Sequence, residues 1–304
     1  MPVLLPVAGI SISLPLLVGV GGLVGFLSGM FGVGGGFLLT PILMMVGVPP
    51  TVAAASDSCQ IVAASSSGTA AHFRLGNVDM KLGTFVLLGG LSGGWVGVRM
   101  IKILRLMGSA DFVITVTYVV VLSAIGGYMF WESLRSLRRG ALVPKSHITV
   151  RGEGFLGRLP FQVDFPHSRV RHSLAFPFLL GGMVGILAAI MGVGGGFIMV
   201  PMMVYLLRMP MHVAVGTDLF QILFTCAGVT FMQAVTNHTV DLVLALLLAA
   251  GSTIGAQIGA RVGKRLRGDQ LKILLASIVL IVMVKMAFGL LRTPAIMLNA
   301  VKGH

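Results

Sequence analysis

The sequence predicts an all-α polytopic membrane protein built from two homologous repeats, each with a Gly-rich break among its helices. Hydrophobic residues make up 56% of the 304 residues, charged residues make up only 10%, and the mean hydropathy is +0.99. A soluble domain carries about 25% charged residues, so this composition excludes one. One pattern of residues also occurs twice along the chain, which indicates a duplicated unit.

The duplication is clearest in a glycine motif. Residues 24–37 read VGFLSGMFGVGGGF, and residues 184–197 read VGILAAIMGVGGGF. The match continues downstream at an offset that drifts only from 160 to 162 positions. The matching residues are Pro41, Pro49, Ala53, Asp57, Gln60, Asp79, Gly93, Gly97 and Arg99 in the first copy, and Pro201, Pro210, Ala214, Asp218, Gln221, Asp241, Gly255, Gly259 and Arg261 in the second.

Apolar stretches long enough to span a bilayer recur along the chain, since a spanning helix needs about 20 largely apolar residues. Small residues spaced four apart predict helices that pack closely in a membrane. Such spacings occur at Gly89, Gly93 and Gly97 and again at Gly251, Gly255 and Gly259. The predicted spans are Leu14–Phe31, Val52–Ala71, Leu82–Val98, Phe112–Trp131, Leu174–Met191, Val213–Val235, Val240–Ala260 and Leu271–Leu291.

The stretch from Leu14 to Val48 allows two interpretations, because glycines interrupt it at Gly32–Gly36. It forms either two crossings or a re-entrant hairpin that folds back inside the membrane. Both interpretations give each half an odd number of crossings. The sequence leaves this choice open.

The net charge of +13 does not indicate a nucleic-acid-binding protein, because Lys and Arg lie in short clusters between apolar stretches. Such clusters mark membrane topology and contact lipid headgroups. An odd number of crossings per half places 16 Lys and Arg on one face and 5 on the other, whereas an even number gives 12 and 9. The positive-inside rule therefore predicts inverted repeats with both termini outside.

Three parts of the chain are expected from this topology. Residues 1–131 form the first transmembrane repeat, and residues 173–304 form the second. Residues 132–172 form a polar, basic, cytoplasmic connector, in which His147–Val150 and Leu159–Phe165 alternate in a way that predicts a small β-hairpin.

The Gly-rich breaks are the first candidate site. Consecutive glycines unwind a helix, and unwound backbone in a membrane must be buried in protein or line a cavity. Its free N–H groups, with the N-terminus of the helix that follows, favour an anion. The alternative is that these glycines only let helices touch. The predicted substrate-binding glycines are Gly34, Gly35, Gly36, Gly194, Gly195 and Gly196.

The helix after each break is the second candidate. Asp57 and Asp218 lie within apolar segments, and an ionisable residue there is costly unless it faces the bundle interior or a water-filled cavity. They are predicted to couple transport to an ion; the alternative is that they cap helix N-termini. Asp79 and Asp241 are expected to be such caps. Ser58, Gln60, Thr217 and Gln221 are the polar neighbours expected to bind substrate.

No enzyme is expected, because the sequence has no paired carboxylates, no Ser/His arrangement and no His/Cys cluster. The sequence accordingly predicts no catalytic residues, no metal ligands and no cofactor. Cys59 and Cys226 lie in apolar segments and are interpreted as packing residues. Arg99 and Arg261 are interpreted as anchors at the membrane interface.

The doubled glycine motif, with Pro41 and Pro201 and the Gly-x-x-x-Gly-x-Arg endings at 93–99 and 255–261, resembles the TauE/SafE family. These are bacterial sulfite and organosulfonate exporters, also called the 4-toluene sulfonate uptake permease family. The resemblance implies a multi-pass secondary transporter of the bacterial inner membrane. The halves are not equivalent, because Ala188-Ala189 replaces Ser28-Gly29 in the second copy.

The leading hypothesis is a secondary carrier for sulfite, thiosulfate or an organosulfonate. Its expected partners are the small anionic substrate and the lipid bilayer, with no nucleic acid. Coupling to protons or to sodium ions, the direction of transport and assembly into a homo-oligomer are left open. The alternative is a membrane-embedded sulfur-handling subunit or receptor that acts through the 132–172 loop.

Overall fold

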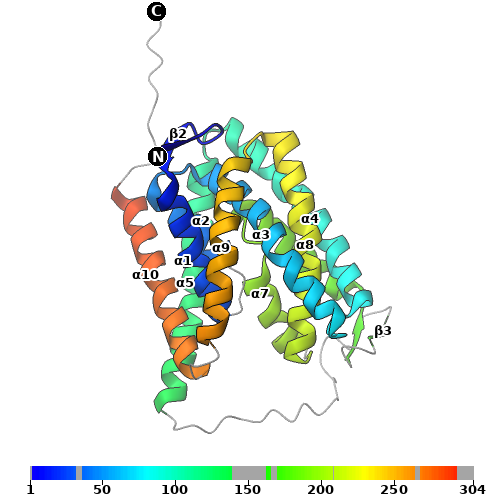
Figure 1. The fold of residues 1–304 in the computed structure, drawn as a ribbon. Coiled ribbons are helices and arrows are strands. Elements are labelled where there is room, and N and C mark those ends of the chain that lie inside the picture. The colour runs from blue at the N-terminus through cyan, green and yellow to red at the C-terminus, as the bar shows by residue number, and fades with distance from the viewer. Residues whose placement is uncertain are drawn as a thin grey trace, which may run out of the picture.

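The computed structural model describes residues 2–31, 36–138, 162–165, 170–207, 209–263 and 268–292. These residues form a helical bundle with a β-hairpin before each half, which confirms the predicted all-α polytopic fold (Figure 1). The first half contains β1 (Pro2–Leu5), β2 (Ile10–Ser13), α1 (Leu14–Phe31), α2 (Gly36–Val46), α3 (Pro50–Arg74), α4 (Met80–Leu106) and α5 (Ala110–Arg138). The second half contains β3 (Gln162–Phe165), β4 (Val170–Ser173), α6 (Ala175–Met191), α7 (Gly196–Pro201), the π-helix η2 (Met202–Leu206), α8 (Met211–Asn237), α9 (Leu242–Gly263) and α10 (Gly268–Arg292).

All eight predicted spans coincide with helices, and α1 has the bounds that its apolar stretch predicts. Among the described residues, four helical segments are both long and apolar enough to cross a membrane: Met80–Leu106, Ala110–Tyr128, Met211–Asn237 and Leu242–Gly259. The helix α3 has 25 residues but is not one of them. Its Ser, Asp and Gln side chains make it the most polar of the long helices, and Asp57 and Gln60 among them are buried in the bundle.

The helices that follow the Gly-rich breaks are too short to span a membrane by themselves. The helix α2 has 11 residues, and α7 and η2 have 6 and 5. At 1.5 Å per residue, 11 residues reach about 16 Å, which is half of the ~30 Å hydrocarbon core. A length of half the hydrocarbon core favours the re-entrant interpretation, which stays a prediction.

The β-hairpin of the connector forms between other strands than those predicted. Strand β3 lies within the predicted Leu159–Phe165 segment, but its antiparallel partner is β4 (Val170–Ser173), so the predicted pairing with His147–Val150 is wrong for these residues. Residues 147–150 themselves lie outside the described residues. The hairpin β1–β2 has the same strand lengths, and each of its strands begins 160 positions before its counterpart in β3–β4. The short alternation Ile10-Ser11-Ile12-Ser13 is the signal that could have predicted it.

Helices of the first half pack against helices of the second half. The helix α1 lies along α9, and α4 lies along α6. Glycines make this close approach possible, as the predicted spacing indicates: a Cβ at Gly259 would lie 1.9 Å from the Phe26 carbonyl oxygen, and one at Gly93 would lie 1.9 Å from the Gly182 carbonyl oxygen. Backbone contact of this kind is typical of small residues at transmembrane helix interfaces.

The equivalent helices α3 and α8 pack against each other and run in opposite directions. Gly216 of α8 approaches Asn77, beyond the end of α3, whereas Leu219 approaches Gly68 inside α3. Contacts therefore move back along α3 as the chain advances along α8. Figure 1 shows the same relation: α3 ends near the lower end of the bundle, and α8 begins there.

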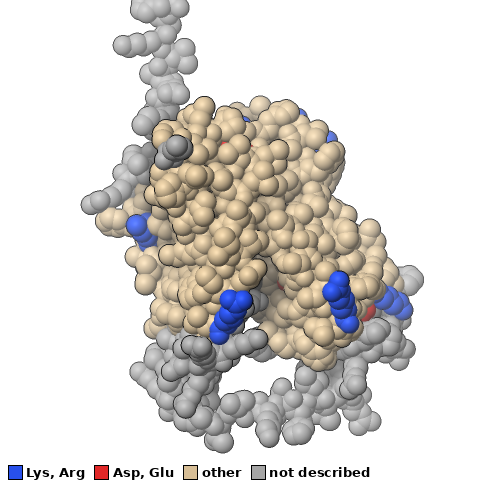
Figure 2. Space-filling view, viewed as in Figure 1, with Lys and Arg blue, Asp and Glu red and all other residues tan. Residues whose placement is uncertain are grey.

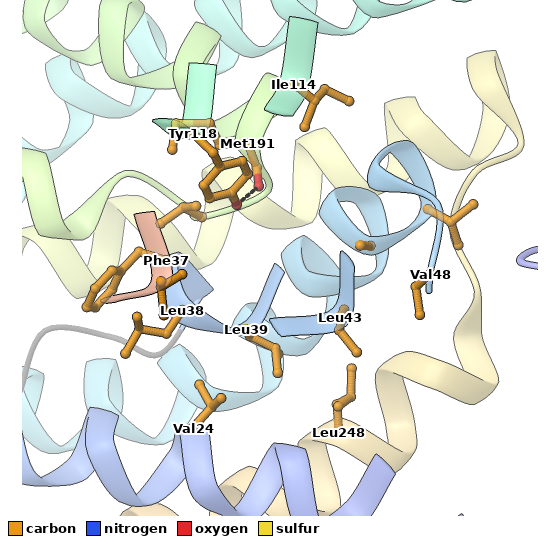
Figure 3. Close-up of a cluster of buried hydrophobic side chains, with 14 of the residues drawn as sticks. Val24, Phe37, Leu38, Leu39, Leu43, Val48, Ile114, Tyr118, Met191 and Leu248 are labelled. Carbon is orange, nitrogen blue, oxygen red and sulfur yellow. Dashed lines mark hydrogen bonds between the residues drawn. The ribbon is translucent and has the colours of Figure 1, made fainter. Parts of the chain in front are cut away.

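The largest apolar cluster encloses α2, whose residues are buried from Gly36 to Pro41 and at Leu43 (Figure 3). Leu38 and Leu39 pack there with Tyr118 of α5 and Leu248 of α9. A helix that is hydrophobic on all sides is stable only when protein or lipid surrounds it. The core thus holds the half-length segment inside the bundle.

Candidate functional site

The start of α2, where the first Gly-rich break ends, lies against the second break. Phe37 and Phe197, the first side chains after each break, stack with ring centroids 5.4 Å apart. A Cβ at Gly36 would lie 3.3 Å from the Cα of Val193 in the second break. Ile61 of α3 and its equivalent Ile222 of α8 fill the space beside them, and both are buried. The centre between the breaks is therefore closed by apolar side chains.

The second break is described in full, and its backbone is left-handed. Gly192, Gly194 and Gly195 have φ angles of 75°, 69° and 84°. A Cβ at Gly194 would lie 2.9 Å from Sγ of Cys226, and one at Gly195 would lie 2.0 Å from Cγ1 of Val184. Only glycine adopts these positive φ angles without strain and also avoids the clashes that a Cβ would cause. Of the first break, Gly34 and Gly35 lie outside the described residues.

Three glycine N–H groups of this break find no backbone acceptor in the described part of the chain. The backbone bonds around it are donated by Gly192 to Ala188 and by Ile198 and Met199 to the Gly195 carbonyl. No backbone acceptor among the described residues takes the N–H groups of Gly194, Gly195 and Gly196. Successive N–H groups in such a turn form a concavity that suits an anion.

Asp57 and Asp218 are both buried, at 0% and 3% exposure, so the prediction that they face the interior is confirmed. The capping alternative is wrong. Both lie seven residues after the first residue of α3 or α8, and the N-cap residues there are Pro49 and Pro210. The two acids nevertheless differ in their surroundings.

Asp57 has a hydroxyl partner, because Thr40 Oγ1 of α2 donates a 2.7 Å hydrogen bond to its Oδ2 atom. The position equivalent to Thr40 in the second half is Val200, which has no hydroxyl group. The Oδ2 atom of Asp218 instead lies 2.9 Å from where a Cβ would stand at Gly196. The Asp218 carboxyl group is thus directly beside the second break.

The two glutamines differ in the same way. Gln60 Nε2 donates a 2.6 Å bond to Ser252 Oγ of α9. The equivalent of Ser252 is Gly90, and Gln221 Nε2 donates instead to Thr225 Oγ1 on its own helix, at 2.8 Å. The Gln221 Oε1 atom has no hydrogen-bond partner among the described residues.

Ser58 and Thr217, also predicted to bind substrate, make structural bonds. Ser58 Oγ donates to the Ala54 carbonyl of its own helix at 3.3 Å. Thr217 Oγ1 accepts the Asp79 N–H at 3.0 Å, and the equivalent bond runs from the Asp241 N–H to Ser56 Oγ at 2.9 Å. Their role in substrate binding stays a prediction.

The predicted caps are confirmed. Asp79 Oδ1 accepts the Leu82 N–H at 3.0 Å, and Asp241 Oδ1 accepts the Leu244 N–H at 3.1 Å. Arg99 is exposed and lies over the Trp95 ring, with its Cζ atom 5.2 Å from the centroid, a cation–π contact. Its place at a lipid interface stays a prediction.

Sequence reasoning missed how the unpartnered polar atoms are distributed. Among the described residues, every buried side-chain oxygen or nitrogen without a hydrogen-bond partner lies on α3 or α8. Two pairs, Asp57 with Asp218 and Thr69 with Thr230, occupy equivalent positions of the two repeats. The shared spacing of 12 residues was visible in the sequence, but only the packing of α3 on α8 shows that both stripes are internal. The six atoms are Asp57 Oδ1, Thr69 Oγ1, His72 Nδ1, Asp218 Oδ1, Gln221 Oε1 and Thr230 Oγ1.

The outer surface suggests how a solute approaches this interior. Figure 2 shows the visible face hollowed near its lower end, with Lys or Arg side chains on both sides of the hollow. The helices α3 and α9 end in this part of the bundle (Figure 1), and Arg74 and Arg261 are exposed in their last turns. Positive charges around a concave mouth attract anions.

Comparisons with known proteins agree with this architecture. A family model described as "Sulfite exporter TauE/SafE" matches residues 17–286. The chain is 26% identical over 265 residues to "Probable membrane transporter protein YjnA" of Bacillus subtilis, which covers 85% of this chain and 93% of the relative. It is 25% identical over 248 residues to "Probable membrane transporter protein YunE" of the same organism, covering 79% and 85%.

A plant relative, "Sulfite exporter TauE/SafE family protein 1" of Arabidopsis thaliana, is 29% identical over 123 residues, which is 38% of this chain and 27% of that protein. No solved structure matches the chain.

Proposed function

The chain belongs to the sulfite exporter TauE/SafE family of membrane transporters, and we propose that it carries sulfite, thiosulfate or an organosulfonate across the bacterial inner membrane. The proposal treats it as a secondary carrier that alternates between two openings. It rests on the family description, on the glycine breaks and on the buried polar face of α3 and α8.

The observation that carries the proposal is the meeting of the two breaks. Phe37 and Phe197, which follow the two breaks, stack on each other, and the second break has glycine N–H groups that find no backbone acceptor among the described residues. Sulfite, thiosulfate and sulfonates present several oxygen atoms that accept hydrogen bonds and carry negative charge. Fixed N–H donors can bind such a group without the desolvation of a lysine or arginine.

Alternating access follows from the way the halves are related. The antiparallel packing of α3 on α8 and the exchanged pairs α1–α9 and α4–α6 support two inverted repeats. In such a carrier one half rocks against the other around a central site. The apolar contact of Phe37, Phe197, Ile61 and Ile222 would separate the two sides, and rocking would open it to one side at a time.

Purified protein in liposomes tests the proposal directly. Radiolabelled sulfite, thiosulfate and 4-toluenesulfonate would each be offered under outward and inward concentration gradients, and in exchange against internal unlabelled anion. We expect protein-dependent flux of at least one of them, and no flux of chloride. Absence of flux for all three anions in every configuration would refute the proposed substrate class.

A further inference from the structure

Asp218 is a buried carboxyl group beside a cluster of backbone donors. Its Oδ2 atom lies against Gly196, and no backbone acceptor among the described residues takes the N–H groups of Gly194, Gly195 and Gly196. Its Oδ1 atom has no hydrogen-bond partner, and no Lys or Arg of the described chain pairs with it. An unpaired buried carboxylate costs several kcal/mol, and binding a proton removes that charge.

Asp57, the equivalent acid of the first repeat, has a hydrogen-bond donor that Asp218 lacks. Thr40 holds its Oδ2 atom at 2.7 Å, from the half-length helix α2. At the equivalent position, Val200 offers Asp218 no hydroxyl donor. Of the two acids, Asp218 is therefore the one without a side-chain hydrogen-bond donor among the described residues, and its carboxyl group lies beside Gly196.

We propose that Asp218 binds the coupling proton, and that its charge controls whether the substrate anion can occupy the adjacent glycine cradle. This rests on the proposed function and adds the driving ion. When Asp218 is ionised, its charge repels an anion from the cradle. When it takes up a proton, this repulsion is removed, so that one proton and one anion occupy the site together.

A polar route for the proton lies on the opposite helix. The contact between Gly68 and Leu219, with α3 and α8 antiparallel, places Thr69 at the same height as Asp218. Thr69 Oγ1 and His72 Nδ1, toward the end of α3, are buried without hydrogen-bond partners. Hydroxyl and imidazole groups of this kind relay protons in membrane carriers.

The chemistry at Asp218 favours a proton over a sodium ion. A metal cation requires several oxygen ligands, whereas a proton requires one. The nearest neighbours of the break are instead apolar, including Ile61 and Ile222.

Other titratable groups also face this region and must be considered in any pH dependence. Asp57 and His72 belong to α3, and Cys226 lies two turns along α8 on the same face. Asp79 precedes α4, and its N–H is bonded to Thr217. The helices α6 and α7 carry no titratable side chain.

The test uses full-length protein in liposomes, with labelled thiosulfate as the probe because this anion stays ionised near neutral pH. The membrane voltage is clamped at zero, and the lumen carries a pH-sensitive dye. For one proton per anion, a gradient of one pH unit should concentrate thiosulfate about tenfold in wild type. Asp218→Asn, which imitates the neutral acid, should abolish accumulation and dye response but retain thiosulfate exchange. Asp111→Asn, at an exposed acid, should behave as wild type.

Accumulation by Asp218→Asn would overturn the inference. So would thiosulfate transport by wild type without proton movement, or with dependence on sodium, although either result would leave the proposed function intact. Infrared spectroscopy gives a readout that does not need transport: wild type should show the band of a protonated carboxyl group that Asp218→Asn lacks. If no sulfur anion is moved, the proposed function fails, and the lack of this band would separately refute Asp218 as a proton site.

Discussion

Replacing Gly195 with alanine should damage both stability and transport, for two separate physical reasons. Its φ angle of +84° is left-handed, which costs a residue with a Cβ about 1–2 kcal/mol. The added Cβ would also lie 2.0 Å from Cγ1 of Val184, where ordinary contact begins at 3.4 Å. Val184 is buried, so the clash must be relieved by moving α6 or the break, at a further cost of about 1–3 kcal/mol.

The matched control is Gly108→Ala, between α4 and α5. Gly108 has a φ angle of +69°, but nothing lies within 4 Å of the position of its added Cβ. This variant therefore has the backbone strain without the clash. At roughly 2–4 °C per kcal/mol, the Gly195 variant should unfold several degrees below the Gly108 variant. Thermal unfolding in detergent measures this difference, and size-exclusion chromatography confirms that each variant remains folded at the temperature of the flux assay.

Transport measurements distinguish the two interpretations of the break, an anion-binding site or a place where helices pack closely. A shifted backbone disturbs the N–H groups at Gly194–Gly196, so Gly195→Ala should lose thiosulfate flux while Gly108→Ala keeps it. If the two variants unfold at the same temperature and both transport at the wild-type rate, the break does not need glycine. The anion cradle would then lose its basis, and close helix packing would be the better account.

Three further predictions concern packing, capping and topology. Gly25→Ala places a Cβ 2.2 Å from a carbonyl oxygen of α9, whereas Gly19→Ala on the same helix meets nothing within 4 Å, so only the first should lower the unfolding temperature. Asp241→Ala removes the acceptor of two backbone N–H groups and should cost about 2–4 kcal/mol in denaturant unfolding, and Asp241→Asn should restore only part of this stability, because its amide has one acceptor oxygen. After replacement of the native cysteines, a cysteine at Ser109 should react with an impermeant thiol reagent in intact cells and one at Ser146 should not; the reverse pattern would invert the proposed orientation.

Local signals were sufficient to predict most of the helices. The apolar stretch Leu14–Phe31 gave the bounds of α1, and the Asp79 and Asp241 side chains marked the starts of α4 and α9. These features depend on residues within one or two turns of each other. The short hairpins were harder to predict, because strands of four residues leave little periodicity to detect.

The partners of these helices could not be predicted, because they depend on contacts far apart in the chain. The glycines at 89–97 predicted close packing but did not reveal that α6 is the partner of α4. Likewise, Asp57 was expected to be internal, but its bond to Thr40 depends on how α2 folds back after the break. The Oδ2 atom of Asp218 meets Gly196 for a similar reason.

The differences between the halves matter because the halves are otherwise so alike. A carrier with identical repeats would hold two equivalent acids, and a single proton would have no preferred site. Val200 in place of Thr40 and Gly90 in place of Ser252 each remove a hydroxyl group from the surroundings of Asp218 and Gln221. The fold needs neither change, since α3 and α8 have the same kind of start and similar lengths. As a result of these substitutions, Asp57 and Gln60 each have a side-chain partner on another helix, whereas Asp218 has none and Gln221 bonds only within its own helix. That difference gives a duplicated scaffold one site at which a proton and an anion can bind together.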